Sequence, residues 1–281
     1  MKEVSFTVFD LCYIIFLKYF YPHYIPKKYL ENKYGYRKQI LFECGGGYWS
    51  YYCGIVKMIK ETYSRNYLDD IAWIGASAGV FPLINAAYIE NPDKTMNYMM
   101  YLLSCAPQTW YGGIGSFNQI IYNHYHKDYL QKYKEKILLK QSQTFLAVLN
   151  INILCPIFSS LSFYYDFDNM NDFSESCIAS HGIPLITGDL KSTLISHPKK
   201  WYIKRMDAGV LTVLYGFFFG YEKFLPYGNR LPSHVIYPHI FRPYTLKNAW
   251  LSPNYLHHYD LYHLGYYDAK RNKKILDKMI L

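Results

Sequence analysis

The stretch from Ile71 to Gly79 constrains the fold of this chain most strongly. The apolar run Ile71–Ile74 has the length of a buried strand, and Gly75-Ala76-Ser77-Ala78-Gly79 follows it directly. A second apolar run, residues 80–89, is long enough to begin a helix. Small residues on both sides of Ser77 suit a tight turn, because the backbone there is crowded. The sequence therefore predicts a strand, a sharp turn with Ser77 at its apex, and a helix.

Ser77 in such a turn has the position of a nucleophile. Its hydroxyl would stand clear of the sheet at a helix N-terminus, where free N–H groups, that of Ala78 included, favour negative charge. Attack on an ester creates that charge on the carbonyl oxygen. A five-residue pattern of small residues also arises by chance, and Ser77 is then only the N-cap of a helix. Further motifs elsewhere in the chain favour the interpretation of Ser77 as a nucleophile over that of an N-cap.

Three consecutive glycines follow a second predicted strand. Residues 39–44 are strand-like and lead into Gly45, Gly46 and Gly47, after which residues 51–59 have helical spacing. Glycines let backbone N–H groups converge on an anion without obstruction by side chains. The triplet precedes Ser77 by one strand–helix–strand unit, so we expect its N–H groups beside the serine as an oxyanion hole. A flexible turn is the alternative interpretation.

A carboxylate at the end of a later strand completes the candidate site. Residues 201–206 are strand-like and end at Asp207-Ala208-Gly209. An aspartate with a pKa of about 4 is a weak base for a serine hydroxyl, and burial in an apolar pocket would make it a better one. Asp207 as an ordinary strand-end turn residue is the alternative. A Ser–Asp–His triad ranks second to a dyad, with five histidines downstream: His234, His239, His257, His258 and His263.

These blocks together resemble the patatin-like phospholipase family. The resemblance rests on the Gly45–Gly47 triplet, the G-x-S-x-G turn, an Ala179-Ser180-x-x-Ile183-Pro184 block and Asp207-Ala208-Gly209, and it spans roughly residues 39–269. It implies a three-layer α/β/α fold with a mainly parallel central sheet. It also implies a Ser–Asp dyad that works without histidine, metal or organic cofactor. The alternation of strand-like and helix-like runs independently predicts an α/β protein.

Two positions depart from the family pattern. Ala208 stands where the family usually has glycine, and it costs about 1 kcal/mol if that position needs a positive φ. Trp49 and Ser50 stand where many relatives have a basic residue and a glycine. These departures leave a second hypothesis, a patatin-fold lipid-binding or scaffold protein whose active site has drifted.

The function that the resemblance implies is that of a lipid acyl hydrolase. Ser77 would attack the ester carbonyl, and Asp207 would act first as base and then as acid. The N–H groups of the glycine triplet (chiefly Gly46 and Gly47) and of Ala78 would hold the oxyanion. The substrate would be a phospholipid or another acyl ester.

Length and composition agree with this class. A chain of 281 residues, 51% hydrophobic and 18% charged, suits one large-cored domain and excludes a disordered chain or a coiled coil. The net charge of +9 without a nucleic-acid-binding motif favours an anionic membrane, and not nucleic acid, as partner. The six cysteines have no C-x-x-C or metal-ligand spacing, which favours reduced core cysteines of a cytosolic protein and no metal site.

Residues 1–37 are expected to form a hydrophobic N-terminal segment and linker ahead of a domain at 38–281. Residues 4–21 are apolar and aromatic, but Asp10 and Lys18 interrupt them, so they fall short of a membrane-spanning helix. They also lack a signal-peptide cleavage site. A helix packed on the domain and a segment lying in a membrane interface both fit, with the interface slightly favoured.

Two later segments have two interpretations each. The apolar run 210–221 is either core or the wall of an acyl-chain groove beside Asp207. The basic tail 270–280 is either a solvated helix or a membrane contact. We therefore expect a cytoplasmic protein that associates peripherally with a membrane.

Overall fold

The structure, a computed structural model, describes residues 1–7, 30–105, 120–139, 143–155, 159–183, 193–209, 212–213, 216–217, 220–221, 224–243, 245 and 254–281. The strands within these ranges are β1 (Lys2–Thr7), β2 (Lys38–Phe42), β3 (Ile71–Ala76), β4 (Thr144–Asn152), β5 (Ser160–Tyr165), β6 (Ile195–Ser196), β7 (Ile203–Asp207) and β8 (Ser233–Ile236). The α-helices are α2 (Trp49–Thr62), α3 (Arg65–Asp69), α4 (Val80–Ala87), α5 (Pro92–Cys105), α7 (Lys134–Leu138), α8 (Met170–His181), α12 (Tyr255–Arg271) and α13 (Lys273–Ile280). Two short 3-10 turns, η1 (Gly46–Tyr48) and η2 (Ser77–Gly79), lead into α2 and α4.

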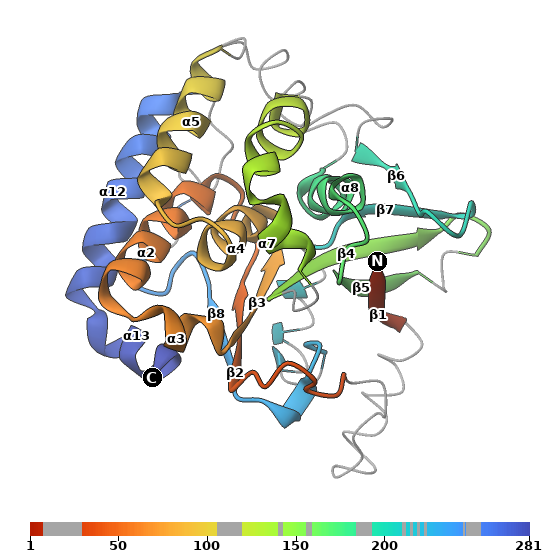
Figure 1. Cartoon of the computed structure of the whole chain (residues 1–281), viewed down its shortest axis with the longest axis horizontal. Coiled ribbons are helices and arrows are strands. Elements are labelled where there is room, and N and C mark those ends of the chain that lie inside the picture. The colour runs from red at the N-terminus through yellow and green to blue at the C-terminus, as the bar shows by residue number, and fades with distance from the viewer. Residues whose placement is uncertain are drawn as a thin grey trace.

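A single eight-stranded sheet organises the described chain (Figure 1). Its order is β1-β5-β4-β3-β2-β8, and β7 also pairs with β4 and carries β6 at its edge. The central strands β4, β3, β2 and β8 are parallel, whereas β5, β1 and β7 are antiparallel to their neighbours. Helices pack against the sheet, so the protein is an α/β protein with a parallel centre, as the alternation of segments predicts.

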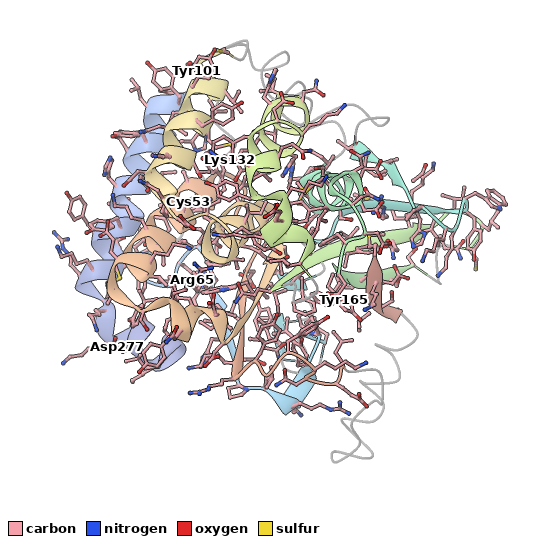
Figure 2. The ribbon with its side chains drawn as sticks, in the orientation of Figure 1. Cys53, Arg65, Tyr101, Lys132, Tyr165 and Asp277 are labelled. Carbon is pink, nitrogen blue, oxygen red and sulfur yellow. The ribbon has the colours of Figure 1, made fainter. Side chains whose placement is uncertain are left out.

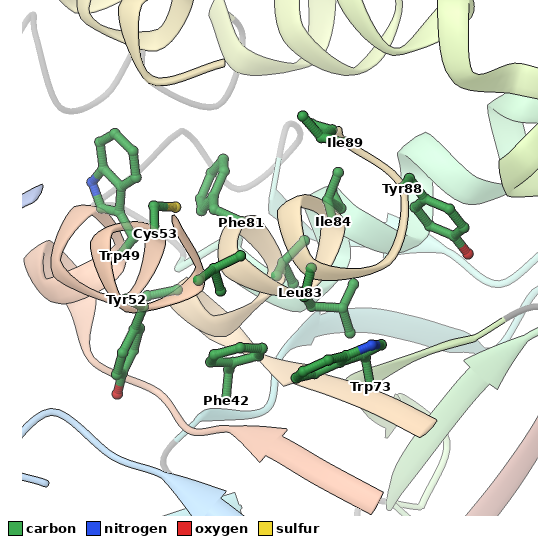
Figure 3. Packing of buried hydrophobic residues seen from close by; sticks show 14 of the residues in the cluster. Phe42, Trp49, Tyr52, Cys53, Trp73, Phe81, Leu83, Ile84, Tyr88 and Ile89 are labelled. Atoms are coloured by element: carbon green, nitrogen blue, oxygen red, sulfur yellow. The ribbon is translucent and has the colours of Figure 1, made fainter. Parts of the chain in front are cut away.

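Both faces of the central strands are buried. Phe42 and Trp73 point to one face, where their rings stack with centroids 5.7 Å apart beneath helices α2 and α4 (Figure 3). Leu41 and Ile74 point to the other face and join a second apolar cluster with Tyr227. Burial on both faces explains why β3 reads as an unbroken apolar run in the sequence.

Helix α12 packs closely on α2 because a glycine of each helix faces the backbone of the other. A Cβ at Gly54 would lie 1.9 Å from the carbonyl oxygen of Tyr262, and a Cβ at Gly265 would lie 2.0 Å from that of Tyr51. The two backbones therefore approach more closely than any larger residue would permit. Helix α12 thereby fixes α2 and the glycine triplet before it.

The C-terminal helix α13 turns two of its apolar residues toward the domain. Leu276 and Ile280 are both buried in the main core cluster. Leu276 and Ile280 are therefore not available to a membrane, whereas Ile275 stays exposed, and a membrane contact of this tail stays a prediction.

The first residues of the chain belong to the sheet. Residues 2–7 form β1, an edge strand that pairs antiparallel with β5. The helix considered for residues 4–21 is therefore wrong for residues 4–7, which are part of a strand. The predicted boundary at residue 38 separated this strand from the domain, whereas the structure pairs it with β5 of that domain. The remainder of that segment, with the linker prolines, lies outside the described residues. No helix within the described ranges has the length and apolar character needed to span a bilayer.

Candidate active site

Strand register brings Ser77 and Asp207 together. The first half of β4 pairs with β3, with Ala147 opposite Ala76, the residue before Ser77. The second half of β4 pairs on the same side with β7, with Val148 opposite Asp207. Strands β3 and β7 therefore meet end to end along β4, at adjacent positions. The sequence predicted that one strand ends at Ser77 and another at Asp207, and the structure brings these two ends next to each other.

The turn at Ser77 is strained, and the serine side chain is buried at its apex. Ser77 has a φ of 56°, and among the described residues only Asp166 shares a positive φ without being glycine. The left-handed conformation costs a residue with a side chain about 1–2 kcal/mol. The surrounding glycines hold it in place, since a Cβ at Gly79 would lie 2.1 Å from the carbonyl oxygen of Phe42 and one at Gly75 would lie 2.7 Å from that of Gly79. The predicted strand, sharp turn and helix are confirmed.

The Asp207 carboxyl lies where burial makes it a better base. Its Oδ1 accepts a hydrogen bond of 2.7 Å from the Gly209 N–H. Burial raises the pKa of Asp207 to about 6, although hydrogen bonds from the Ser77 hydroxyl and the Gly209 amide lower it in part. Oδ2 is buried and has no partner of full hydrogen-bond geometry among the described residues. The Ser77 hydroxyl therefore lies close enough to the Asp207 carboxyl to lower its pKa, and one oxygen of that carboxyl has unused acceptor capacity.

Gly209 lies between the side chains of Ser77 and Asp207. From the sequence it was assigned no role. A Cβ there would lie 2.5 Å from Cβ of Cys44, 2.9 Å from Cβ of Ser77 and 3.0 Å from Oδ1 of Asp207. Only glycine fits between these groups. Its place two residues after the carboxylate is the signal that could have identified it. Cys44, also without an assigned role, borders the site, and burial raises the pKa of its thiol.

Ala208 causes no backbone strain. Its φ is not positive, because Ser77 and Asp166 are the non-glycine residues of the described ranges that have one. Its carbonyl oxygen accepts from the N–H of Thr212 at 2.9 Å, as in a first helical turn. Alanine at this position therefore does not carry the strain of about 1 kcal/mol expected for a positive φ. Asp207 caps the turn through Oδ1.

The glycine triplet lies beside the serine turn. Gly46 has a φ of 52° and begins η1, which contacts η2. Because η1 leads into α2 and η2 leads into α4, two helix N-termini meet here, and the first N–H groups of a helix have no partner within it. The triplet and Ala78 thus lie close together, and an oxyanion hole formed by their N–H groups stays a prediction. Gly45 is tightly packed, with Pro238 3.1 Å from the position of a Cβ.

Trp49 and Ser50, the second departure from the family pattern, hold helices together. The buried ring of Trp49 lies 5.4 Å from that of Phe81 on α4 and 5.0 Å from that of His258 on α12. The Ser50 hydroxyl is 3.2 Å from Nδ1 of His258. Both residues therefore serve packing behind the glycine triplet.

The segment around Ser180 supports both strand ends. The Ser180 hydroxyl donates to the carbonyl oxygen of Ala147 at 2.6 Å, beside the end of β3. The N–H of Asp207 donates to the carbonyl oxygen of Gly182 at 3.3 Å. The block that resembles the family motif between serine and aspartate therefore has a structural role here; its Pro184 lies outside the described residues.

No histidine among the described residues is a partner of the Asp207 carboxylate. The groups that shift the pKa of Asp207 are its own burial, Ser77 and Gly209, and no histidine is among them. His258 contacts Ser50, and His181 contacts His126 with 3.3 Å between their Nε2 atoms. The described geometry favours a dyad over a triad.

Arg205, which sequence reasoning missed, anchors the strand that carries Asp207. Its guanidinium is buried and donates to the Ser176 hydroxyl, to Glu175 and to the Ser196 carbonyl oxygen, each at 3.1 Å. These bonds tie β7 to α8 and β6. A basic residue in a strand usually indicates a solvated position, so the sequence held no signal for this anchor.

Comparisons with protein-family models, with curated proteins and with solved structures found no match.

Proposed function

We propose that this protein is a serine acyl hydrolase of the patatin-like type, acting on lipid esters through a Ser77–Asp207 dyad. The observation that carries the proposal is the end-to-end meeting of β3 and β7 along β4, which sets a strained serine beside a buried carboxyl of raised pKa. A perturbed carboxyl next to an activated hydroxyl is typical of nucleophilic catalysis. The three-layer patatin-like fold is part of the proposal.

The dyad performs acylation as follows. The Ser77 oxygen bonds to the ester carbonyl carbon while its proton passes to Oδ2 of Asp207. The N–H groups of Gly46, Gly47 and Ala78 stabilise the negative charge on the carbonyl oxygen. The carbon–oxygen bond to the alcohol then breaks, and the alcohol leaves with the proton from Asp207.

Deacylation repeats these steps with water as the nucleophile. Asp207 takes a proton from the water, whose oxygen bonds to the acyl carbon. Collapse releases the carboxylic acid and returns the proton to the Ser77 oxygen. The dyad needs no further group, because a carboxyl with a pKa of about 6 is largely ionised at neutral pH yet basic enough to accept a proton.

A fluorophosphonate probe tests the proposal. The wild type should be labelled on the peptide that contains Ser77, and Ser77→Ala should not be labelled. Asp207→Asn should stay folded and lose labelling by at least about 100-fold, because the base is gone. Labelling of neither wild type nor variants would favour the drifted, non-enzymatic protein. Loss of activity in a folded histidine variant, such as His258→Ala, would favour the triad.

A further inference from the structure

The far end of β4 and the β6–β7 hairpin project together from the sheet (Figure 1). The Ile153 N–H donates to the Tyr202 carbonyl oxygen at 3.0 Å, so the two loops are joined. Three large apolar side chains at this end are exposed, Trp201 at 72%, Leu154 at 65% and Ile153 at 49%. Together with Lys199 and Lys200 they form what we call the tip.

The tip carries positive charge beside its apolar side chains. Neither of the two segments that build it, 143–155 and 193–206, contains an aspartate or glutamate. Lys199 and Lys200 are exposed next to Trp201, and the acidic neighbour Glu3 lies 3.8 Å from the Lys200 ammonium. A tryptophan and aliphatic residues beside two lysines match the layered chemistry of a lipid surface, apolar below and anionic above.

The tip stands at the edge of the sheet that carries the candidate site. Strand β4 runs parallel to β3 and continues for five residues beyond Ala147, to Asn152. That extension corresponds to about 17 Å at the usual rise of a strand. Strand β7 returns from the tip and ends at Asp207. A surface touched by the tip therefore lies toward the edge where Ser77 is placed.

We propose that the tip docks the protein on bilayers that contain anionic lipid. The inference rests on the proposed function, to which it adds the surface on which the substrate would be presented. Trp201, Leu154 and Ile153 enter the headgroup boundary, and Lys199 and Lys200 bind lipid phosphates. Helix α13 is a weaker candidate, since its Leu276 and Ile280 are buried in the domain.

Flotation with vesicles tests the docking directly. Vesicles of phosphatidylcholine alone are compared with vesicles that also contain phosphatidylserine. We expect the wild type to bind the anionic vesicles, and Trp201→Ser to weaken binding about tenfold. The double variant Lys199→Gln/Lys200→Gln should weaken it by about 25-fold at low salt, and less at high salt, because each lysine near the surface contributes on the order of fivefold.

Matched variants elsewhere control for exposure and charge. Tyr101 is 61% exposed at the end of α5 (Figure 2), so Tyr101→Ser removes a comparable exposed ring far from the tip. Lys273→Gln/Lys274→Gln removes two charges from α13. Both controls should bind vesicles as the wild type does. Equal loss in the controls and in the tip variants would overturn the proposal, because binding would then follow total charge or apolarity.

Hydrolysis of a monomeric water-soluble ester separates this proposal from the proposed function. Tip variants should keep wild-type rates on that ester, and Ser77→Ala should lose hydrolysis while still binding vesicles. Absence of hydrolysis in every protein would reject the hydrolase without altering the binding result. A wild type that binds neither vesicle, or a Trp201→Ser variant that binds like the wild type, overturns the docking.

Discussion

Replacing Gly209 by alanine should disable the site without unfolding the protein. The added Cβ would lie 2.5 Å from Cβ of Cys44, 2.9 Å from Cβ of Ser77 and 3.0 Å from Oδ1 of Asp207. Carbon atoms in favourable contact are about 3.5–4.0 Å apart, so these groups must separate by about 1 Å. A misplacement of that size costs on the order of 100-fold in catalysis. We therefore expect kcat/KM on a soluble ester to fall by about two orders of magnitude.

The assay combines ester hydrolysis with thermal unfolding. Gly35→Ala is the matched control, because Gly35 has a φ of 74° and no atom within 4 Å of the position of a Cβ. The control should lose about 1 kcal/mol of stability and keep its activity. Cys44→Gly in the Gly209→Ala background removes the shortest contact and should restore part of the rate. A folded Gly209→Ala variant with activity within about twofold of the wild type would refute this reasoning.

Three further predictions concern pH, the strand anchor and helix packing. Since Asp207 must be ionised to act as base, kcat/KM should rise with pH through about 6 and should be about tenfold below its plateau at pH 5. A kcat/KM profile that is flat between pH 5 and 8 would contradict this. Because the folded pKa lies above the ordinary value of 3.8, protonated Asp207 contributes stability that is fully present below pH 3.8 and lost as pH rises through about 6. Denaturant unfolding should therefore show that Asp207→Asn gains stability over the wild type at pH 7 but not at pH 3. Arg205→Ala should cost on the order of 3 kcal/mol in the same assay, and a loss below about 1 kcal/mol would mean that its three hydrogen bonds are not an anchor. Gly54→Ala should lower Tm by several degrees, because α12 must move off α2; an unchanged Tm would show that this close approach is not required.

Local features of the site could be predicted from the sequence. An apolar run followed by small residues predicts a buried strand and a tight turn. The structure has both, as β3 and as the turn in which Ser77 has a positive φ. The glycine triplet and the carboxylate at the end of β7 were found for the same reason, because each is encoded within a few neighbouring residues.

Long-range features could not be predicted in this way. The pairing of β1 with β5 joins segments far apart in the chain, and an aromatic run alone does not reveal its partner. The meeting of β3 and β7 depends on β4 having one partner for its first half and another for its second. Burial of Arg205 depends in turn on α8 and β6 supplying its acceptors.

Mass spectrometry of an acid-quenched reaction tests the central claim most directly. The protein is mixed with an activated ester of a fatty acid and stopped within the first turnover. We predict a mass increase equal to one acyl group, located on the peptide that contains Ser77 and absent from Ser77→Ala. Product release without any acylated protein, or acyl transfer to the neighbouring Cys44 in place of Ser77, would contradict the dyad mechanism.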